Sequence, residues 1–210
     1  MHSTISSLNE DTSEVNKELK YCSASAAISY ENPLYTRESL LYNLTESLMF
    51  LSHIVGDIHQ PLHVGFRADF GGNTIRVHGY QKMTNLHKVW DDNIIQTAMS
   101  DFYGNDLNRM MESIQRNLTE EWMDEIHEWE TCGPKSVACP DKYASESVRL
   151  ACDYAYKNVT NNSTLGDEYF LSRLPIVQKR IAQAGVRLAS VLNRIFDVSG
   201  GQRNPVVAIA

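Results

Sequence analysis

Apolar residues recur at helical spacing along most of this chain, and short polar or Gly/Pro-rich stretches separate the periodic segments. The first periodic segment begins near Arg37, where Thr36 is suited to cap a helix, and continues to about Gln60. This spacing predicts a long, largely buried helix. The first 30 residues are Ser-rich and polar without a sustained period, so we expect them to be poorly ordered or of unrelated sequence.

The periodic pattern is interrupted first at Pro61, which cannot continue a helix and biases Gln60 toward extended backbone. Gly71 and Gly72 mark a turn, and the NTIRVHGY sequence after Gly71 predicts a short strand within a β-hairpin. Helical periodicity then returns in four segments, at about 85–99, 106–130, 143–157 and 167–196. The predicted fold is therefore predominantly α-helical, with one short β-hairpin.

Composition limits the possible classes of protein. The chain has 210 residues, of which 42% are hydrophobic, and we expect a single domain over residues 1–210. A net charge of −7 argues against binding of nucleic acid by a Lys/Arg surface, because that mode needs cationic side chains. The sequence contains no run of 18 or more apolar residues, so we expect no membrane span.

Histidines are concentrated in one part of the chain, since five of the seven lie between residues 53 and 87. A single histidine is more often a buried hydrogen-bonding group than a ligand, but five together favour a metal site. These five are His53, His59, His63, His78 and His87.

Two HxxxD motifs, His53 with Asp57 and His87 with Asp91, each place two ligands four residues apart on one helix face. Between them, His63 follows the proline turn and can approach from a loop. His63, His87 and Asp91 supply three protein ligands, the number that a catalytic zinc site keeps while leaving a position for water. His53 and Asp57 would form half of a second site. Imidazole and carboxylate ligands favour zinc, with manganese or iron as alternatives.

We expect no metal role for three other histidines. His59 is out of the motif spacing and should tolerate replacement by alanine. His78 should point outward from the hairpin, and His127 lies in a segment whose Trp and Met residues are most simply core.

Four cysteines and five N-x-S/T acceptors are typical of the secretory pathway. Cys132 and Cys139 are close enough in sequence for a local disulfide. The start of the chain lacks the apolar core of a signal peptide, which suggests that a front end is missing. Further acceptors are present at Asn161 and Asn162, and we expect glycosylation at Asn43, Asn117 and Asn158.

Several motifs resemble those of the plant bifunctional nucleases: HIVGDIHQPLH, GGNTI, NLHKVWD and the closing YFLSRLPIVQKRIAQAGVRLASVLNRIF. The resemblance extends from about Tyr42 to Phe196. These nucleases belong with the fungal zinc-dependent single-strand nucleases and share the fold of bacterial zinc phospholipase C. The resemblance implies that fold for this chain, with a location in the secretory pathway, either extracellular or vacuolar.

In that family three zinc ions line a cleft, and the resemblance assigns His63, His87 and Asp91 to one of them. It assigns His53 and Asp57 to the closely spaced pair of ions, which Asp57 would bridge. The family's amino-terminal Trp, its upstream His and Asp ligands and its acidic residue near the attacking water have no counterpart here. We therefore expect one complete zinc site and a chain that lacks roughly the first third of a mature family member.

The resemblance further implies a monomeric endonuclease that hydrolyses phosphodiester bonds of single-stranded DNA and RNA to 5′-phosphate products. Asn93 matches a position at which family members contact substrate, and Asn73 would border the same cleft. For Asn73 a turn role after two glycines is equally expected. Phe66 either stacks on a base or caps its loop. Two alternatives stay open, namely an inactive fragment with one zinc and a zinc phospholipase C-like hydrolase.

The resemblance also bears on the cysteines. It pairs Cys132 with Cys139, whereas Cys22 and Cys152 would each pair with a cysteine in the missing part.

Overall fold

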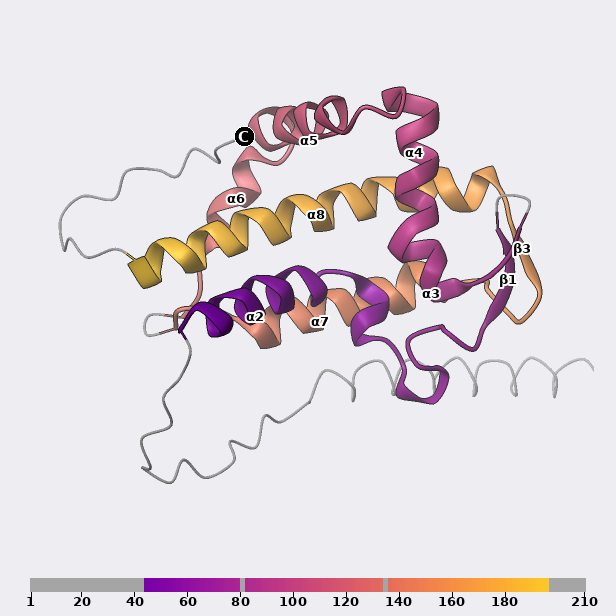
Figure 1. The fold of residues 1–210 in the computed structure, drawn as a ribbon, viewed down its shortest axis with the longest axis horizontal. Coiled ribbons are helices and arrows are strands. Elements are labelled where there is room, and N and C mark those ends of the chain that lie inside the picture. The colour runs from indigo at the N-terminus through magenta and orange to yellow at the C-terminus, as the bar shows by residue number, and fades with distance from the viewer. Residues whose placement is uncertain (1–43, 80–81, 134–135, 197–210) are drawn as a thin grey trace, which may run out of the picture.

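The computed structural model describes residues 44–79, 82–133 and 136–196, and these residues are predominantly α-helical (Figure 1). The longest helix, α8, spans the molecule and contacts α2, α4, α5 and α6, while a small sheet lies at the end where α8 begins. The α-helices are α2 (Leu44–Asp57), α3 (Leu86–Lys88), α4 (Ile94–Tyr103), α5 (Leu107–Glu120), α6 (Met123–Glu130), α7 (Pro140–Leu150) and α8 (Asp167–Phe196). The shorter elements are the 3₁₀ helices η1 (Pro61–Val64) and η2 (Arg67–Asp69), the π-helical segments η3 (Val89–Asn93) and η4 (Ala151–Ala155), and the strands β1 (Arg76–Gly79), β2 (Lys82–Asn85) and β3 (Ser163–Leu165).

The sheet contains the predicted hairpin and one strand that was not predicted. Strand β1 pairs antiparallel with β2 and parallel with β3, which gives the order β2-β1-β3. His78 on β1 is exposed, as expected. β3 has only three residues and pairs with a strand far away in the sequence, so no local pattern marks it.

The single helix predicted over 106–130 is wrong, because the structure has two helices there. Trp122, between α5 and α6, has φ −109° and ψ 9°, which ends the first helix and turns the chain. Both Trp122 and Trp129 are then buried, with their ring centroids 6.1 Å apart. Burial of two large aromatic rings in one cluster outweighs continuation of the helix.

The expectation that the first helix is largely buried is also wrong for its described part. Within α2 only Val55 is buried, whereas Leu44, Met49, Phe50 and Ile54 are 53% to 79% exposed. The helix packs against α8 along one side. These four apolar side chains therefore form an exposed apolar face of α2, and the segment predicted from Arg37 to Asn43 lies outside the described residues.

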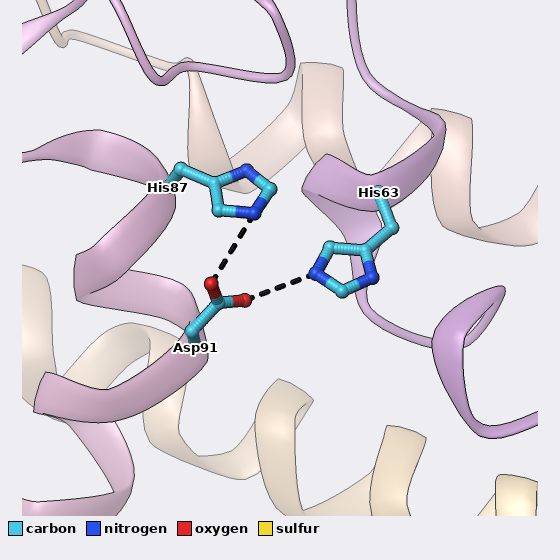
Figure 2. Close-up of side chains that lie close together, drawn as sticks. All are labelled: His63, His87 and Asp91. Carbon is cyan, nitrogen blue, oxygen red and sulfur yellow. Dashed lines mark hydrogen bonds and ion pairs between the residues drawn. The ribbon is translucent and has the colours of Figure 1, made fainter. Parts of the chain in front are cut away.

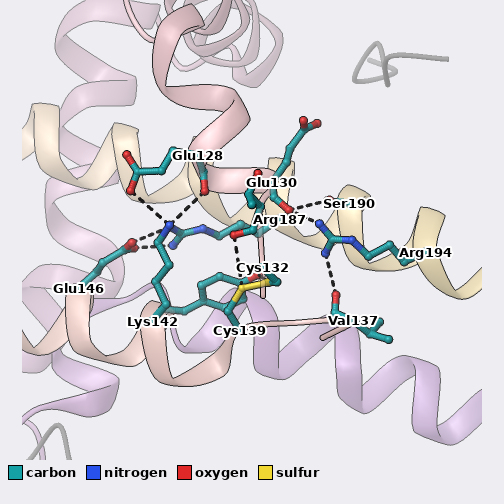
Figure 3. The surroundings of a disulfide bond; sticks show 12 residues. Glu128, Glu130, Cys132, Val137, Cys139, Lys142, Glu146, Arg187, Ser190 and Arg194 are labelled. Carbon is teal, nitrogen blue, oxygen red and sulfur yellow. Dashed lines mark hydrogen bonds and ion pairs between the residues drawn. A yellow bond between two sulfur atoms is a disulfide. The ribbon is translucent and has the colours of Figure 1, made fainter. Parts of the chain in front are cut away.

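A disulfide joins Cys132 and Cys139 across the loop between α6 and α7, as predicted (Figure 3). Near it, the Arg194 side chain donates to the carbonyl oxygens of Val137 and Glu130 and fastens the loop to the end of α8. Cys152 is also disulfide-bonded within this chain, so the expectation that its partner lies in a missing part is wrong. The expectation for Cys22 lies outside the described residues.

The expected glycosylation sites fall in different surroundings. Asn158 lies in an exposed turn with φ 60°, and Asn117 is on helix α5. Asn43 lies outside the described residues. None of the helices in the described part of the chain is long and apolar enough to cross a membrane.

The larger of two apolar clusters lies beneath the segments that carry the predicted ligands. It contains Leu62, Leu86 and Trp90, which are each within one residue of a predicted metal ligand. The Trp90 indole donates to the Tyr169 hydroxyl at 2.8 Å, which fixes η3 against α8. Burial of these neighbours holds the backbone of the ligand segments in place.

Candidate metal centre

His63, His87 and Asp91 converge at one point on the surface (Figure 2). One ligand atom from each lies within 4.8 Å of the other two. Asp91 Oδ1 is 3.1 Å from His63 Nε2 and Asp91 Oδ2 is 3.2 Å from His87 Nε2. The two imidazole rings are stacked, with their centroids 5.0 Å apart. The structure thus brings together the three residues that the sequence assigned to a complete site.

The segment that carries His87 and Asp91 folds locally for clear reasons. The Asn85 side chain accepts a hydrogen bond from the Lys88 N–H at 2.7 Å, which caps the start of α3. The helix then widens into η3, a type of π-segment that is frequent at functional sites. Val89 and Trp90 are buried in the core while Asp91 stays partly exposed, so the carboxylate points away from the core.

His63 is placed by the turn that ends α2. Gln60 has extended backbone, φ −83° and ψ 116°, as predicted from the proline that follows. Pro61 is the first residue of the 3₁₀ helix η1, so His63 lies in a short helical turn and not in the open loop that we expected. Leu62 is buried and directs its neighbour His63 outward.

Both imidazoles are oriented by hydrogen bonds at Nδ1. His87 Nδ1 is 2.8 Å from the Gly71 carbonyl oxygen, which can only accept, so Nδ1 carries the proton and Nε2 is free to bind a metal. His63 Nδ1 is 2.5 Å from Asp57 Oδ1 and is oriented in the same way. Metal-binding histidines usually have such outer acceptors. Two Nε2 lone pairs and a carboxylate at one point fit a divalent cation of the zinc class.

The other two predicted ligands are arranged differently. Asp57 lies at the end of α2 and reaches the centre through its hydrogen bond to His63. Its side chain is 43% exposed. His53 is exposed on α2 and does not belong to the three-residue group found among the described residues. The structure therefore groups three of the five predicted ligands, with Asp57 at the edge of the group.

Gln60 also contacts the centre, a role that the sequence analysis missed. Its Nε2 donates to Asp91 Oδ1 at 2.7 Å, and its Oε1 accepts from the Leu62 N–H at 2.6 Å. The sequence signal was weak, because a polar residue before Pro at a helix start indicates a cap and not a partner 31 residues away.

The residues predicted to contact substrate are near the centre but have structural contacts of their own. Asn73 Nδ2 donates to the Phe70 carbonyl oxygen at 2.8 Å, which is the turn role that we considered equally expected. The Phe66 ring packs against Tyr156 with centroids 4.8 Å apart. Asn93 ends η3, two residues after Asp91, and is partly buried.

His59 is buried, contrary to the expectation that it could be replaced without effect. Only 2% of the residue is exposed, and its ring lies beside Tyr143 with centroids 5.2 Å apart. Its Nε2 is 2.9 Å from an Arg187 guanidinium nitrogen, which can only donate, so Nε2 accepts and Nδ1 donates to the Val55 carbonyl oxygen. Burial, followed by the charge of Arg180, lowers the pKa of His59 to about 3.

Two arginines of α8 and Glu146 of α7 surround this histidine. Arg187 donates to both carboxylate oxygens of Glu146, at 2.6 and 2.8 Å (Figure 3). Arg180 donates to one of these oxygens at 2.8 Å. Burial alone raises the pKa of the Glu146 carboxyl, but the bonds and charges of Arg187 and Arg180 outweigh this and lower it. Arg180 also donates to the His59 carbonyl oxygen, so the network holds the turn between Asp57 and His63.

Comparison with known proteins identifies the family to which the chain is similar. The family model described as S1/P1 Nuclease matches residues 2–197. Endonuclease 4 of Arabidopsis thaliana is 52% identical over 192 residues, which are 89% of this chain and 64% of that protein. Endonuclease 2 of the same plant is 52% identical over 193 residues, with 90% and 66% covered. Nuclease S1 of Aspergillus oryzae is 33% identical over 184 residues, with 83% and 62% covered. The chain thus spans slightly less than two thirds of the length of these relatives.

Proposed function

Because the chain belongs to the S1/P1 nuclease family, we propose that it is a zinc-dependent endonuclease acting on single-stranded DNA and RNA, with 5′-phosphate products. The observation that carries the proposal is the convergence of His63, His87 and Asp91, each with an outer hydrogen-bond partner. The names of the relatives, endonucleases and a nuclease, support the same class of reaction.

The protein's own residues would prepare the site in two ways. The Gly71 carbonyl and the Asp57 carboxylate keep a proton on the Nδ1 atoms of His87 and His63, so both Nε2 atoms face the metal position as lone pairs. Asp91 adds negative charge, which favours binding of a divalent cation. A bound zinc ion supplies a Lewis acid that polarises a phosphoryl oxygen and lowers the pKa of a bound water.

Charge and shape support a single-stranded substrate. With a net charge of −7, the protein attracts phosphate only where metal charge offsets its own. An unpaired base can turn out and stack on protein side chains beside the metal position, whereas the bases of a duplex are already stacked and paired. Asn93 and Asn73 remain our proposed substrate contacts. His53 and Asp57 would belong to a second metal position of the three that we propose for a complete family member.

The competing proposal is a chain that binds one zinc ion and does not catalyse. Two observations favour it. His53 is exposed on α2. Within the described ranges, His63, His87 and Asp91 are the one group of three or more such side chains that could hold a metal ion. In either case we propose a protein of the secretory pathway, which the Cys132–Cys139 disulfide supports.

Zinc content and cleavage, measured on the same purified protein, test both proposals. We expect at least one zinc ion per chain, and chelator-sensitive release of 5′-phosphate products from single-stranded DNA. One zinc without cleavage would favour the non-catalytic proposal. Cleavage that resists chelator would contradict zinc dependence.

Replacement of Asp91 tests the ligand assignment. Asp91→Ala removes the carboxylate that faces both imidazoles, so we expect zinc affinity to fall by about 100-fold or more, beyond the ~10–100-fold effect of losing an outer partner. The matched control is His78→Ala, which removes an exposed histidine on β1. Unchanged zinc content in Asp91→Ala would show that the assigned ligand set is wrong.

A further inference from the structure

Gln60 connects two parts of the metal centre that are far apart in sequence. It lies three residues after the end of α2 and directly before η1, which carries His63, while Asp91 belongs to η3. Its side-chain amide contacts both segments, through Nε2 to Asp91 Oδ1 at 2.7 Å and through Oε1 to the Leu62 N–H at 2.6 Å. One side chain therefore sets the distance between the two segments.

The orientation of this amide follows from its partners. The Leu62 N–H can only donate, so the atom facing it must be the oxygen, and the NH₂ group then faces the Asp91 carboxylate, which accepts. The opposite orientation would place donor against donor and acceptor against acceptor. The backbone of Gln60 is also fixed, because its N–H donates to the Asp57 carbonyl oxygen at 3.0 Å.

The contact bears directly on how Asp91 can bind a cation. Asp91 Oδ1 accepts from Gln60 and lies 3.1 Å from His63, while Oδ2 faces His87. A carboxylate held at one oxygen by a neutral donor cannot rotate freely, so less conformational entropy is lost when it binds a metal. Gln60 has no charge, and therefore holds Asp91 without competing with a cation as an arginine or lysine would.

We infer that Gln60 is a positioning residue for the metal centre, which keeps the Asp91 carboxylate in the geometry that binds the ion. The inference rests on the proposed function, because it presumes that His63, His87 and Asp91 bind a divalent metal. A purely structural role, in which Gln60 only caps η1, is the alternative to be tested.

Gln60→Glu separates the two roles. Glutamate keeps an oxygen that accepts from the Leu62 N–H, but it loses the NH₂ donor and places a second carboxylate against Asp91. If Gln60 positions Asp91, the dissociation constant for Zn²⁺, measured on the full chain by competition with a chromophoric chelator, should rise about 10–100-fold. If Gln60 only caps the turn, the constant should stay the same or fall, because added negative charge beside the centre favours a cation.

Two further measurements make the result specific. Gln115→Glu on α5 introduces the same charge away from the centre and should leave Zn²⁺ affinity unchanged. Thermal unfolding of the metal-free proteins should show that Gln60→Glu is folded. Weaker binding in folded Gln60→Glu but not in Gln115→Glu supports the inference, and equal binding in all three proteins overturns it while the proposed metal site stands. Failure of the unsubstituted chain to bind Zn²⁺ would overturn the proposed function and, with it, this inference.

Discussion

The histidines of this protein differ in what their ring nitrogens contact. His63 and His87 direct Nδ1 at an acceptor oxygen, which leaves Nε2 available as a ligand. His59 has the same chemistry but directs Nε2 at the Arg187 guanidinium, so its lone pair is already used. Whether a histidine here can bind a metal therefore depends on the hydrogen-bond partners of its ring. Being close to an HxxxD motif in the sequence is not sufficient.

His59 makes the stability of the protein depend on pH. Burial and Arg180 lower its pKa from 6.5 to about 3 in the folded state, so between these values the unfolded chain binds a proton that the folded chain does not. Stability should therefore decrease as the pH falls below about 6.5. At pH 5 the loss relative to neutral pH should be about 2 kcal/mol, from 1.36 kcal/mol per pKa unit.

The measurement is the free energy of unfolding by denaturant at pH 7 and pH 5, in the presence of chelator. In His59→Ala the part of the pH dependence due to this residue should disappear, so the difference between the two proteins isolates it from the titration of other groups. His78→Ala, which changes an exposed histidine, should keep the full dependence. An identical pH dependence in His59→Ala and the unsubstituted protein would contradict the assignment of a neutral buried imidazole.

At the scale of elements, the centre depends on close packing of two turns. Gly71 has φ +65°, and a Cβ atom added there would clash with the Leu62 carbonyl oxygen. The carbonyl oxygen of the same Gly71 accepts the hydrogen bond from His87 Nδ1 that orients this ring, while Leu62 precedes His63. The missing side chain thus allows the two ligand-bearing turns to meet.

Gly71→Ala should therefore impair both stability and metal binding. We expect a loss of about 1–3 kcal/mol in the free energy of unfolding, because alanine is strained at this φ and displaces the Leu62 turn. Zinc affinity should fall by about 10-fold or more, since His87 loses its orientation. Denaturant unfolding and chelator competition measure the two effects.

The control for Gly71→Ala is Gly185→Ala in α8. A Cβ at Gly185 would meet no heavy atom within 4 Å. In a helix interior this change should stabilise by about 0.5–1 kcal/mol. Normal zinc binding by Gly71→Ala would mean that the two turns do not need this close approach.

Elements with local signals were predictable from the sequence, and elements that depend on distant contacts were not. Most helices and the hairpin follow from periodicity and glycine turns. Of the three grouped ligands, His87 and Asp91 follow from HxxxD spacing and His63 follows from the proline turn. Strand β3 pairs with β1 from more than eighty residues away. The buried role of His59 depends on Arg187, 128 residues later, and that of Gln60 depends on Asp91. Such contacts leave no trace in local periodicity.

At the scale of the whole molecule, the exposed apolar face of α2 departs from the expected burial of this helix. Met49, Phe50 and Ile54 are exposed at helical spacing beside His53 and Asp57, so apolar surface adjoins the predicted second metal position. Contiguous exposed apolar surface is uncommon in stable soluble proteins and favours association with other apolar groups. The binding of an apolar probe measures this exposed apolar surface directly.

Binding of a hydrophobic fluorescent dye to the folded protein should therefore depend on this face of α2. Phe50→Ser should reduce the dye fluorescence by roughly half, because it removes the central aromatic side chain of the exposed patch. Phe102→Ser, which changes a phenylalanine of similar exposure on α4, should have a smaller effect because its ring is stacked with Phe170. Equal reduction in the two variants would show that dye binding is spread over the surface, and that α2 does not carry a distinct apolar patch.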